Sequence, residues 1–80
     1  MNREEILNEF TAEKIGLRIK ELRCKAGLSV RALAELIYTG TNAIYRIERG
    51  RVMPSLSTLV YLSLALGTSI DYMVLGIVKQ

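Results

Sequence analysis

Residues 28–50 read LSVRALAELIYTGTNAIYRIERG, and this stretch decides the expected fold. It opens with a short helical pattern in which Leu33, Ala34 and Ile37 recur at spacings of three and four, so that they share one helix face. A second helical pattern begins after residues 38–40, which leave room only for a sharp turn. The stretch therefore predicts two short helices joined by a tight connection.

The second helical pattern has distinct inward and outward faces. Ile44, Ile47 and the stem of Glu48 lie on the inward face, and the small side chain of Ala34 allows the two helices to cross closely. The outward side chains are of kinds that read base edges or touch phosphates: Thr41, Asn42, Tyr45, Arg46 and Arg49. This arrangement is typical of a helix-turn-helix that presents its second helix to the major groove of double-stranded DNA.

The distribution of charge favours the same interpretation. The chain has 80 residues and a net charge of +3. Residues 14–51 hold nine Lys or Arg against three Glu, whereas residues 1–13 hold one Arg against four Glu. Because a basic surface attracts the phosphate backbone, we expect the segment that contains the helix-turn-helix to face the nucleic acid.

The composition disfavours several other classes of protein. There is no histidine and only one cysteine, Cys24, so neither an enzyme nor a metal or cofactor site is expected. The acidic N-terminus lacks the apolar segment of a signal peptide. Residues 52–70 carry no charge over nearly the length of a membrane helix, but Pro54 and Gly67 interrupt them, which favours an amphipathic core helix. We expect a cytoplasmic protein of bacterial or phage origin.

The periodicity predicts one all-α domain at residues 11–76, between an acidic lead-in at 1–10 and a short apolar tail at 77–80. The lead-in could be a frayed segment or a short extra helix. Five helices are expected in the domain, at residues 11–25, 30–37, 41–48, 56–65 and 70–75. Their expected N-caps are Thr11, Ser29, Gly40, Ser55 and Ser69. On the first of these helices, Ile15 and Ile19 belong to the apolar stripe, whereas Arg18 is expected to point away from it.

From Ile15 to Gly76 the chain resembles the Cro/repressor-type (XRE) helix-turn-helix DNA-binding proteins. The resemblance is carried by Gly27-Leu28-Ser29, by Leu33-Ala34, by the run Ile47-Glu48-Arg49-Gly50 and by the ungapped spacing from Ala34 to Ile44. It implies a five-helix, lambda-repressor-like domain that often works as a dimer on a two-fold symmetric operator.

The resemblance also implies roles for individual residues. Thr41, Asn42 and Arg46 match the positions of the recognition helix that face bases, and Arg23 and Glu48 match a salt bridge behind that helix. Two positions depart from the family pattern, because Val30 replaces a frequent Gln and Tyr38 stands where the turn usually has Gly. A bulky residue with positive φ is uncommon, so either Tyr38 is strained or the turn is rearranged.

Further contacts are predicted around this helix and at the chain end. The candidates for phosphate or backbone contacts are Ser29, Val30, Arg31, Tyr45, Arg49 and Arg51. The predicted homodimer interface consists of apolar residues near the C-terminus, Ile70, Met73, Val74 and Ile77, since exposed apolar clusters often mark an interface.

These features together predict a small stand-alone transcriptional regulator, expected to be a repressor, that binds a palindromic operator as a homodimer and needs no cofactor. The alternative is an antitoxin-like or other partner-binding module with the same fold. In that case the N-terminal segment or the tail would hold a toxin or another partner protein.

Overall fold

The structure, a computed structural model, describes residues 1–78, so Lys79 and Gln80 of the predicted tail lie outside the described residues. Residues 1–78 form six α-helices and no strand, which confirms the all-α prediction. The helices are α1 (Arg3–Glu9), α2 (Ala12–Lys25), α3 (Val30–Leu36), α4 (Thr41–Glu48), α5 (Leu56–Leu66) and α6 (Ile70–Leu75). The count exceeds the expected five because the lead-in forms α1, one of the two alternatives that the sequence left open.

Side-chain caps explain where most of these helices begin. An oxygen of the cap residue accepts a hydrogen bond from the backbone N–H three residues further on, and the caps that do so are Asn2, Thr11, Ser29, Ser55 and Ser69. Each such cap stabilises its helix by about 1 kcal/mol. Gly40 precedes α4 without a side-chain hydrogen bond.

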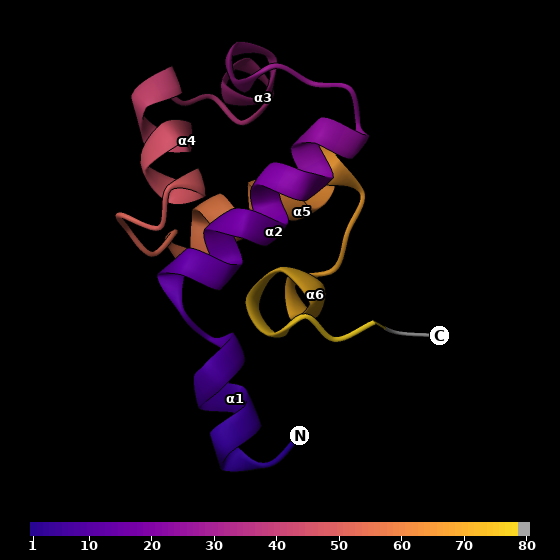
Figure 1. The fold of residues 1–80 in the computed structure, drawn as a ribbon. Helices are drawn as coiled ribbons and strands as arrows, with labels where there is room; N and C mark the ends of the chain where they lie inside the picture. Colours follow the sequence, from indigo (N-terminus) through magenta and orange to yellow (C-terminus); the bar gives the residue numbers. More distant parts are fainter. Residues whose placement is uncertain (79–80) are drawn as a thin grey trace.

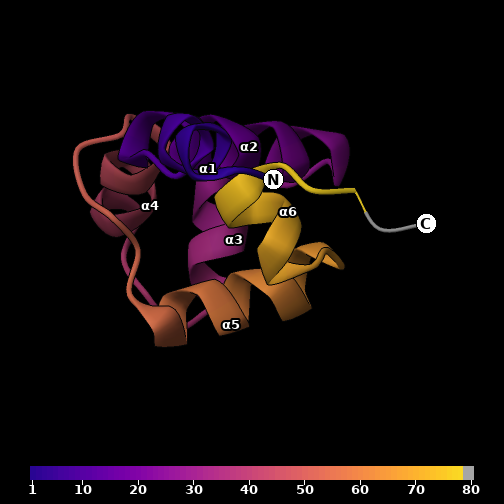
Figure 2. The ribbon, with the colours of Figure 1, turned by 90° about the horizontal axis from the view of Figure 1, so that it is seen from below.

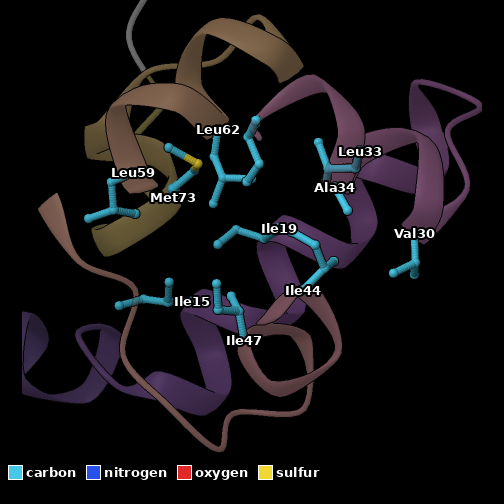
Figure 3. Close-up of a cluster of buried hydrophobic side chains, with 11 residues drawn as sticks. Ile15, Ile19, Val30, Leu33, Ala34, Ile44, Ile47, Leu59, Leu62 and Met73 are labelled. Atoms are coloured by element: carbon cyan, nitrogen blue, oxygen red, sulfur yellow. The ribbon is translucent and has the colours of Figure 1, made fainter. Parts of the chain in front are cut away.

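A single cluster of apolar side chains forms the core (Figure 3). Each helix from α2 to α6 contributes to it a large side chain that is fully buried, and these are Ile15, Ile19, Leu33, Ile44, Leu62 and Met73. The predicted inward faces of the helix-turn-helix are confirmed, because Ala34, Ile37 and Ile47 are also buried. Packing against this common cluster holds α3 and α4, which are each too short to be stable alone.

The helices surround this core. α2 and α5 lie on opposite sides of it, and α3 and α6 fill the space between them (Figures 1 and 2). α1 projects from the start of α2, away from α3 and α4 (Figure 1). The helix-turn-helix therefore occupies one end of the molecule and the acidic α1 the other.

The structure contradicts the prediction that Arg18 points outward. Arg18 is only 9% exposed, because α6 and the end of α1 cover this side of α2. Its guanidinium remains satisfied: Nη1 donates to the Met73 carbonyl oxygen at 3.0 Å, and Nη2 donates to Glu9 Oε1 at 3.0 Å. The side chain thus ties α1 and α6 to α2.

The residues of the predicted dimer interface near the C-terminus pack partly within the chain, and the interface itself stays a prediction. Met73 is fully buried, and Ile70 and Val74 pack against the core of the same chain, while Ile77 is partly buried. The physical reason is that α6 contacts α1, α2 and α5, so its apolar side closes the open end of the core. Met73 is therefore unavailable to a partner, whereas Ile70, Val74 and Ile77 stay partly exposed.

Of the two alternatives for the turn, the structure shows a strained backbone at Tyr38 and not a rearranged turn. Its φ is +59°, and it is the one non-glycine residue with positive φ among residues 1–78. The turn keeps a regular helix C-terminal motif, in which Thr39 N–H donates to the Ala34 carbonyl and Tyr38 N–H to that of Glu35. The side chain of Tyr38 is 88% exposed, so its bulk meets no obstacle in the chain.

The uncharged segment at residues 52–70 is divided between a loop, the 11-residue α5 and the turn before α6. Accordingly, within the part of the chain that the structure describes, none of the helices has the length and apolar character needed to cross a membrane.

Candidate nucleic-acid interface

α4 presents a row of polar and basic side chains to solvent. Thr41, Asn42, Tyr45, Arg46 and Arg49 are all exposed. On the opposite side of the helix, Ile44 and Ile47 are buried in the core. The two faces of α4 are thus the ones that the sequence pattern predicts, and the exposed face carries the side chains suited to base edges and phosphates.

Close packing on α2 fixes the position of α4. At Gly16 of α2, an added Cβ would overlap the carbonyl oxygen of Ile47 and lie 3.1 Å from that of Glu48. Only a residue without a side chain permits this approach between the two helices. The sequence pattern pointed to Ala34 as the small residue at a helix crossing, and it did not single out Gly16.

An ion pair joins the same two helices. Arg23 of α2 donates from Nε to Glu48 Oε2 at 2.7 Å and from Nη2 to Glu48 Oε1 at 3.0 Å, as the family resemblance implies. The two side chains are only 12% and 5% exposed. A third hydrogen bond runs from Arg23 Nη1 to the Leu28 carbonyl at 2.8 Å, so Arg23 also holds the connection between α2 and α3. The hydrogen bond with Glu48 raises the pKa of Arg23 above its already high usual value.

A basic hollow of about 560 Å³ lies beside the exposed face of α4. It is lined by Asn42, Tyr45, Arg46, Arg49 and Arg51. The guanidinium carbon of Arg49 lies 5.3 Å from the centre of the Tyr45 ring, a cation–π arrangement that orients this side chain. The structure therefore gathers three arginines with the amide of Asn42 around one concave surface. Its positive charge and polar groups complement the negative charge and polar groups of a DNA strand.

A second, smaller hollow shares Tyr45 and Arg49 with the first. Its volume is about 240 Å³, and it is lined by Lys20, Arg23, Val30, Tyr45, Glu48 and Arg49. Lys20 is exposed and was missed at the sequence level. Its spacing of three residues from Arg23 placed the two on one side of α2, but only the packing of α4 against α2 brings Lys20 next to Tyr45 and Arg49.

The other residues predicted to contact the DNA backbone also make contacts within the chain. The Ser29 hydroxyl accepts a hydrogen bond from Ala32 N–H as the cap of α3, and the side chain of Val30 is buried in the core. The Ser29 O–H can still donate to a phosphate, whereas Val30 has only its backbone to offer. Arg31 is exposed, with its Nε 3.5 Å from Glu35 Oε1, a surface pair that DNA phosphates can displace at little cost.

Comparison with known proteins agrees with this geometry. A family model described as Helix-turn-helix matches residues 19–73, which include all of α3 and α4. No curated protein sequence matches the chain significantly.

Two solved structures are similar over most of their length. The restriction-modification controller protein C.AhdI from Aeromonas hydrophila is 32% identical with a TM-score of 0.74, and the match covers 78% of this chain and 94% of that one. The clp gene regulator ClgR from C. glutamicum is 26% identical with a TM-score of 0.74, covering 86% of this chain and 95% of that one. The chain belongs to the Cro/repressor-type (XRE) family of helix-turn-helix DNA-binding proteins.

Proposed function

We propose that this protein is a sequence-specific transcriptional regulator that binds double-stranded DNA, places α4 in the major groove and acts as a repressor. The observation that carries the proposal is the exposed row of Thr41, Asn42 and Arg46, which adjoins a hollow lined by three arginines. Polar groups for base edges and cations for the flanking phosphates are the two components that specific DNA binding requires.

The three side chains of the row have distinct proposed roles. Arg46 donates two hydrogen bonds to a guanine, the commonest specific contact between a side chain and a base. Asn42 pairs in a similar bidentate manner with an adenine. Thr41, at the start of α4, contacts a thymine methyl group or a phosphate.

The proposed phosphate contacts surround this row. They come from Tyr45, Arg49 and Arg51 on α4 and the following loop, from Arg31 on α3 and from Lys20 on α2. Contacts of this kind supply affinity that does not depend on base sequence and falls steeply as the salt concentration rises.

We further propose that two copies bind one palindromic operator. A single α4 reaches the base edges of only one half-site. Two copies related by a two-fold axis place their recognition helices about 34–36 Å apart, in successive major grooves on one side of the duplex.

The experiment that tests the proposal selects bound sequences from a random duplex library with the purified protein. The selected duplex and a scrambled duplex of the same length and composition are then titrated at two salt concentrations. We expect a palindromic sequence with an affinity at least roughly a thousandfold above the scrambled control. Equal and strongly salt-dependent binding to both duplexes would show that only the basic surface acts, and would overturn the proposal.

A partner-binding module is the second candidate, and α1 is the feature that favours it. This helix has no buried residue, and Ile6, Leu7 and Phe10 are exposed on or beside it. An antitoxin-like protein could bind its partner with such a segment while α4 binds DNA. Binding of the product of an adjacent gene, lost on deletion of residues 1–10, would favour this candidate.

A further inference from the structure

α5 is apolar on both of its faces. Leu59 and Leu62 point into the core, whereas Leu56, Val60 and Leu64 recur every four residues on the outside and Tyr61 lies next to them. Leu56 and Leu64 are 72% and 75% exposed. A helix that is apolar all round is normally buried on all sides, so the outer face of α5 lacks a covering in the monomer.

Tyr38 extends this apolar face toward the helix-turn-helix. Its ring meets that of Tyr61 edge-on, with the centroids 6.4 Å apart and an angle of 77° between the planes. Tyr38, Leu56, Val60, Tyr61 and Leu64 are called the α5 surface below. The contact between the two tyrosines joins α5 directly to the turn that precedes α4.

The backbone at Tyr38 gives independent evidence that this surface has a use. α2 and α4 end in the same hydrogen-bonded motif as α3, and there the residue with positive φ is a glycine, Gly27 or Gly50. A tyrosine with φ of +59° destabilises the monomer relative to glycine. Within the monomer its ring gains one edge-on contact and remains 88% exposed, so the strain is not offset by burial.

We infer that the α5 surface is covered by a second copy of this chain, which packs the same surface against it about a two-fold axis. The inference rests on the proposed function, since a palindromic operator calls for two copies. It names the contact between them, which lies on a helix face more exposed than the apolar side of α6.

Charge and area both suit a second copy. Residues 52–70 contain no charged side chain, so two chains of net charge +3 can meet there without like charges in contact. Large side chains present on the order of 150–250 Å² when fully exposed, and at their observed exposures the five together present roughly 600 Å². A standard interface buries about 800 Å² per partner, which the polar rim would complete.

The position of the surface links the two copies to DNA binding. Tyr38 lies two residues before Gly40, the residue that precedes α4. Contact at the α5 surface therefore fixes the two recognition helices relative to one another through one short turn in each chain.

Sedimentation equilibrium of the full chain tests the inference. Leu64→Lys places a charge on the most exposed leucine of the surface, and we expect the dimer dissociation constant to rise by about tenfold or more. Leu7→Lys is the matched control, because Leu7 is a 60% exposed leucine on α1, and it should leave the constant unchanged. A dissociation constant for Leu64→Lys equal to that of the unsubstituted chain, or an equal effect of Leu7→Lys, would overturn the inference.

Tyr38→Gly should have opposite effects on the stability of the monomer and on the stability of the dimer. At protein concentrations below the dimer dissociation constant, the melting temperature of this variant should equal or exceed that of the unsubstituted chain, because glycine adopts positive φ without strain. Its dimer should nevertheless be weaker by about tenfold, since an exposed aromatic side chain is lost from the interface. A dimer as tight as that of the unsubstituted chain would contradict the role of Tyr38.

The two proposals fail in distinguishable ways. In one case Leu64→Lys dissociates the dimer, but the protein binds the selected and scrambled duplexes equally. This result would support the dimer contact at the α5 surface and rule out the proposed function. Specific binding with one copy of the protein on a duplex that has two half-sites would retain sequence-specific recognition by α4, but it would rule out the paired copies and the contact at the α5 surface. If both hold, Leu64→Lys should bind a duplex with one half-site normally and lose affinity only for the palindrome.

Discussion

Arg46 and Arg51 line the same basic hollow but have different expected effects on DNA binding. Arg46→Ala should cost about 1–3 kcal/mol on the selected operator and relax the preference at one base position, because a bidentate contact to a base is lost. Arg51→Ala should weaken binding to every sequence alike and lower the slope of log affinity against log salt by about one. Titrations of single-base variants of the operator measure both effects. Unchanged specificity in Arg46→Ala would show that another face of α4 reads the bases.

Arg23 is expected to act on stability and not on base choice. Arg23→Ala leaves the carboxylate of Glu48, whose side chain is 5% exposed, without its cation and frees the Leu28 carbonyl. Loss of one partner of a buried ion pair costs about 3–5 kcal/mol, so we expect a loss near the lower end for this partly buried pair. Chemical denaturation measures it, with Arg23→Lys as a milder variant that retains the charge but not the paired hydrogen bonds. A free energy of unfolding equal to that of the unsubstituted chain would refute the structural role.

At the scale of elements, the contact between α2 and α4 depends on Gly16. Gly16→Ala would push a methyl group into the carbonyls of Ile47 and Glu48, so α4 must shift. We expect a loss of roughly 1–3 kcal/mol in stability, as for other overpacked sites, and weaker operator binding by the molecules that remain folded. Gly40→Ala is the matched control, because a Cβ at Gly40 meets nothing within 4 Å and its φ is −86°. Comparable losses in the two variants would argue against the close approach at Gly16.

The attachment of α1 should depend on pH through Glu9. A hydrogen bond from Lys14, at 2.8 Å, and the nearby Arg18 lower the pKa of the Glu9 carboxyl below its ordinary 4.5. A lowered pKa in the folded state means that the contact stabilises α1 above about pH 4.5 and is lost as the pH falls through the lowered value. The protection factors of amide hydrogen exchange in residues 3–9, which correct for the intrinsic exchange rate at each pH, should therefore fall on acidification.

Glu9→Gln should show these lower protection factors already at neutral pH. It should also flatten the dependence on pH. Glu4→Gln serves as the control, because Glu4 lies in the exposed first turn of the same helix. If the protection factors of residues 3–9 are alike in the two variants, the ion pairs of Glu9 do not hold α1.

The whole molecule separates its charges along its length. α1 belongs to a segment with one Arg and four Glu, and it projects away from the end that carries α3 and α4 (Figure 1). At that end Arg46, Arg49 and Arg51 gather around α4, with Lys20 of α2 beside them. We therefore expect long-range attraction to orient the molecule with α4 toward the duplex before any specific contact forms, with the acidic end away from the phosphates.

Much of this organisation could be predicted from local sequence. Helix positions followed from the caps Thr11, Ser29, Ser55 and Ser69, because capping involves residues only three apart. The exposed face of α4 followed from the spacing of Ile44 and Ile47, since helical periodicity decides which side chains share a face. These determinants act within one turn of helix, and they can be read without knowledge of the fold.

Only the tertiary structure decided how these elements cover one another. Arg18 and Met73 are 55 residues apart, and their burial depends on the packing of α6 over α2, which no local pattern specifies. The same packing places Met73 of α6 in the core and leaves the outer apolar face of α5 exposed, so the inferred dimer contact lies on α5. The sequence determined which side chains are apolar and on which helix face they lie, whereas long-range packing determined which of those faces is covered within the chain.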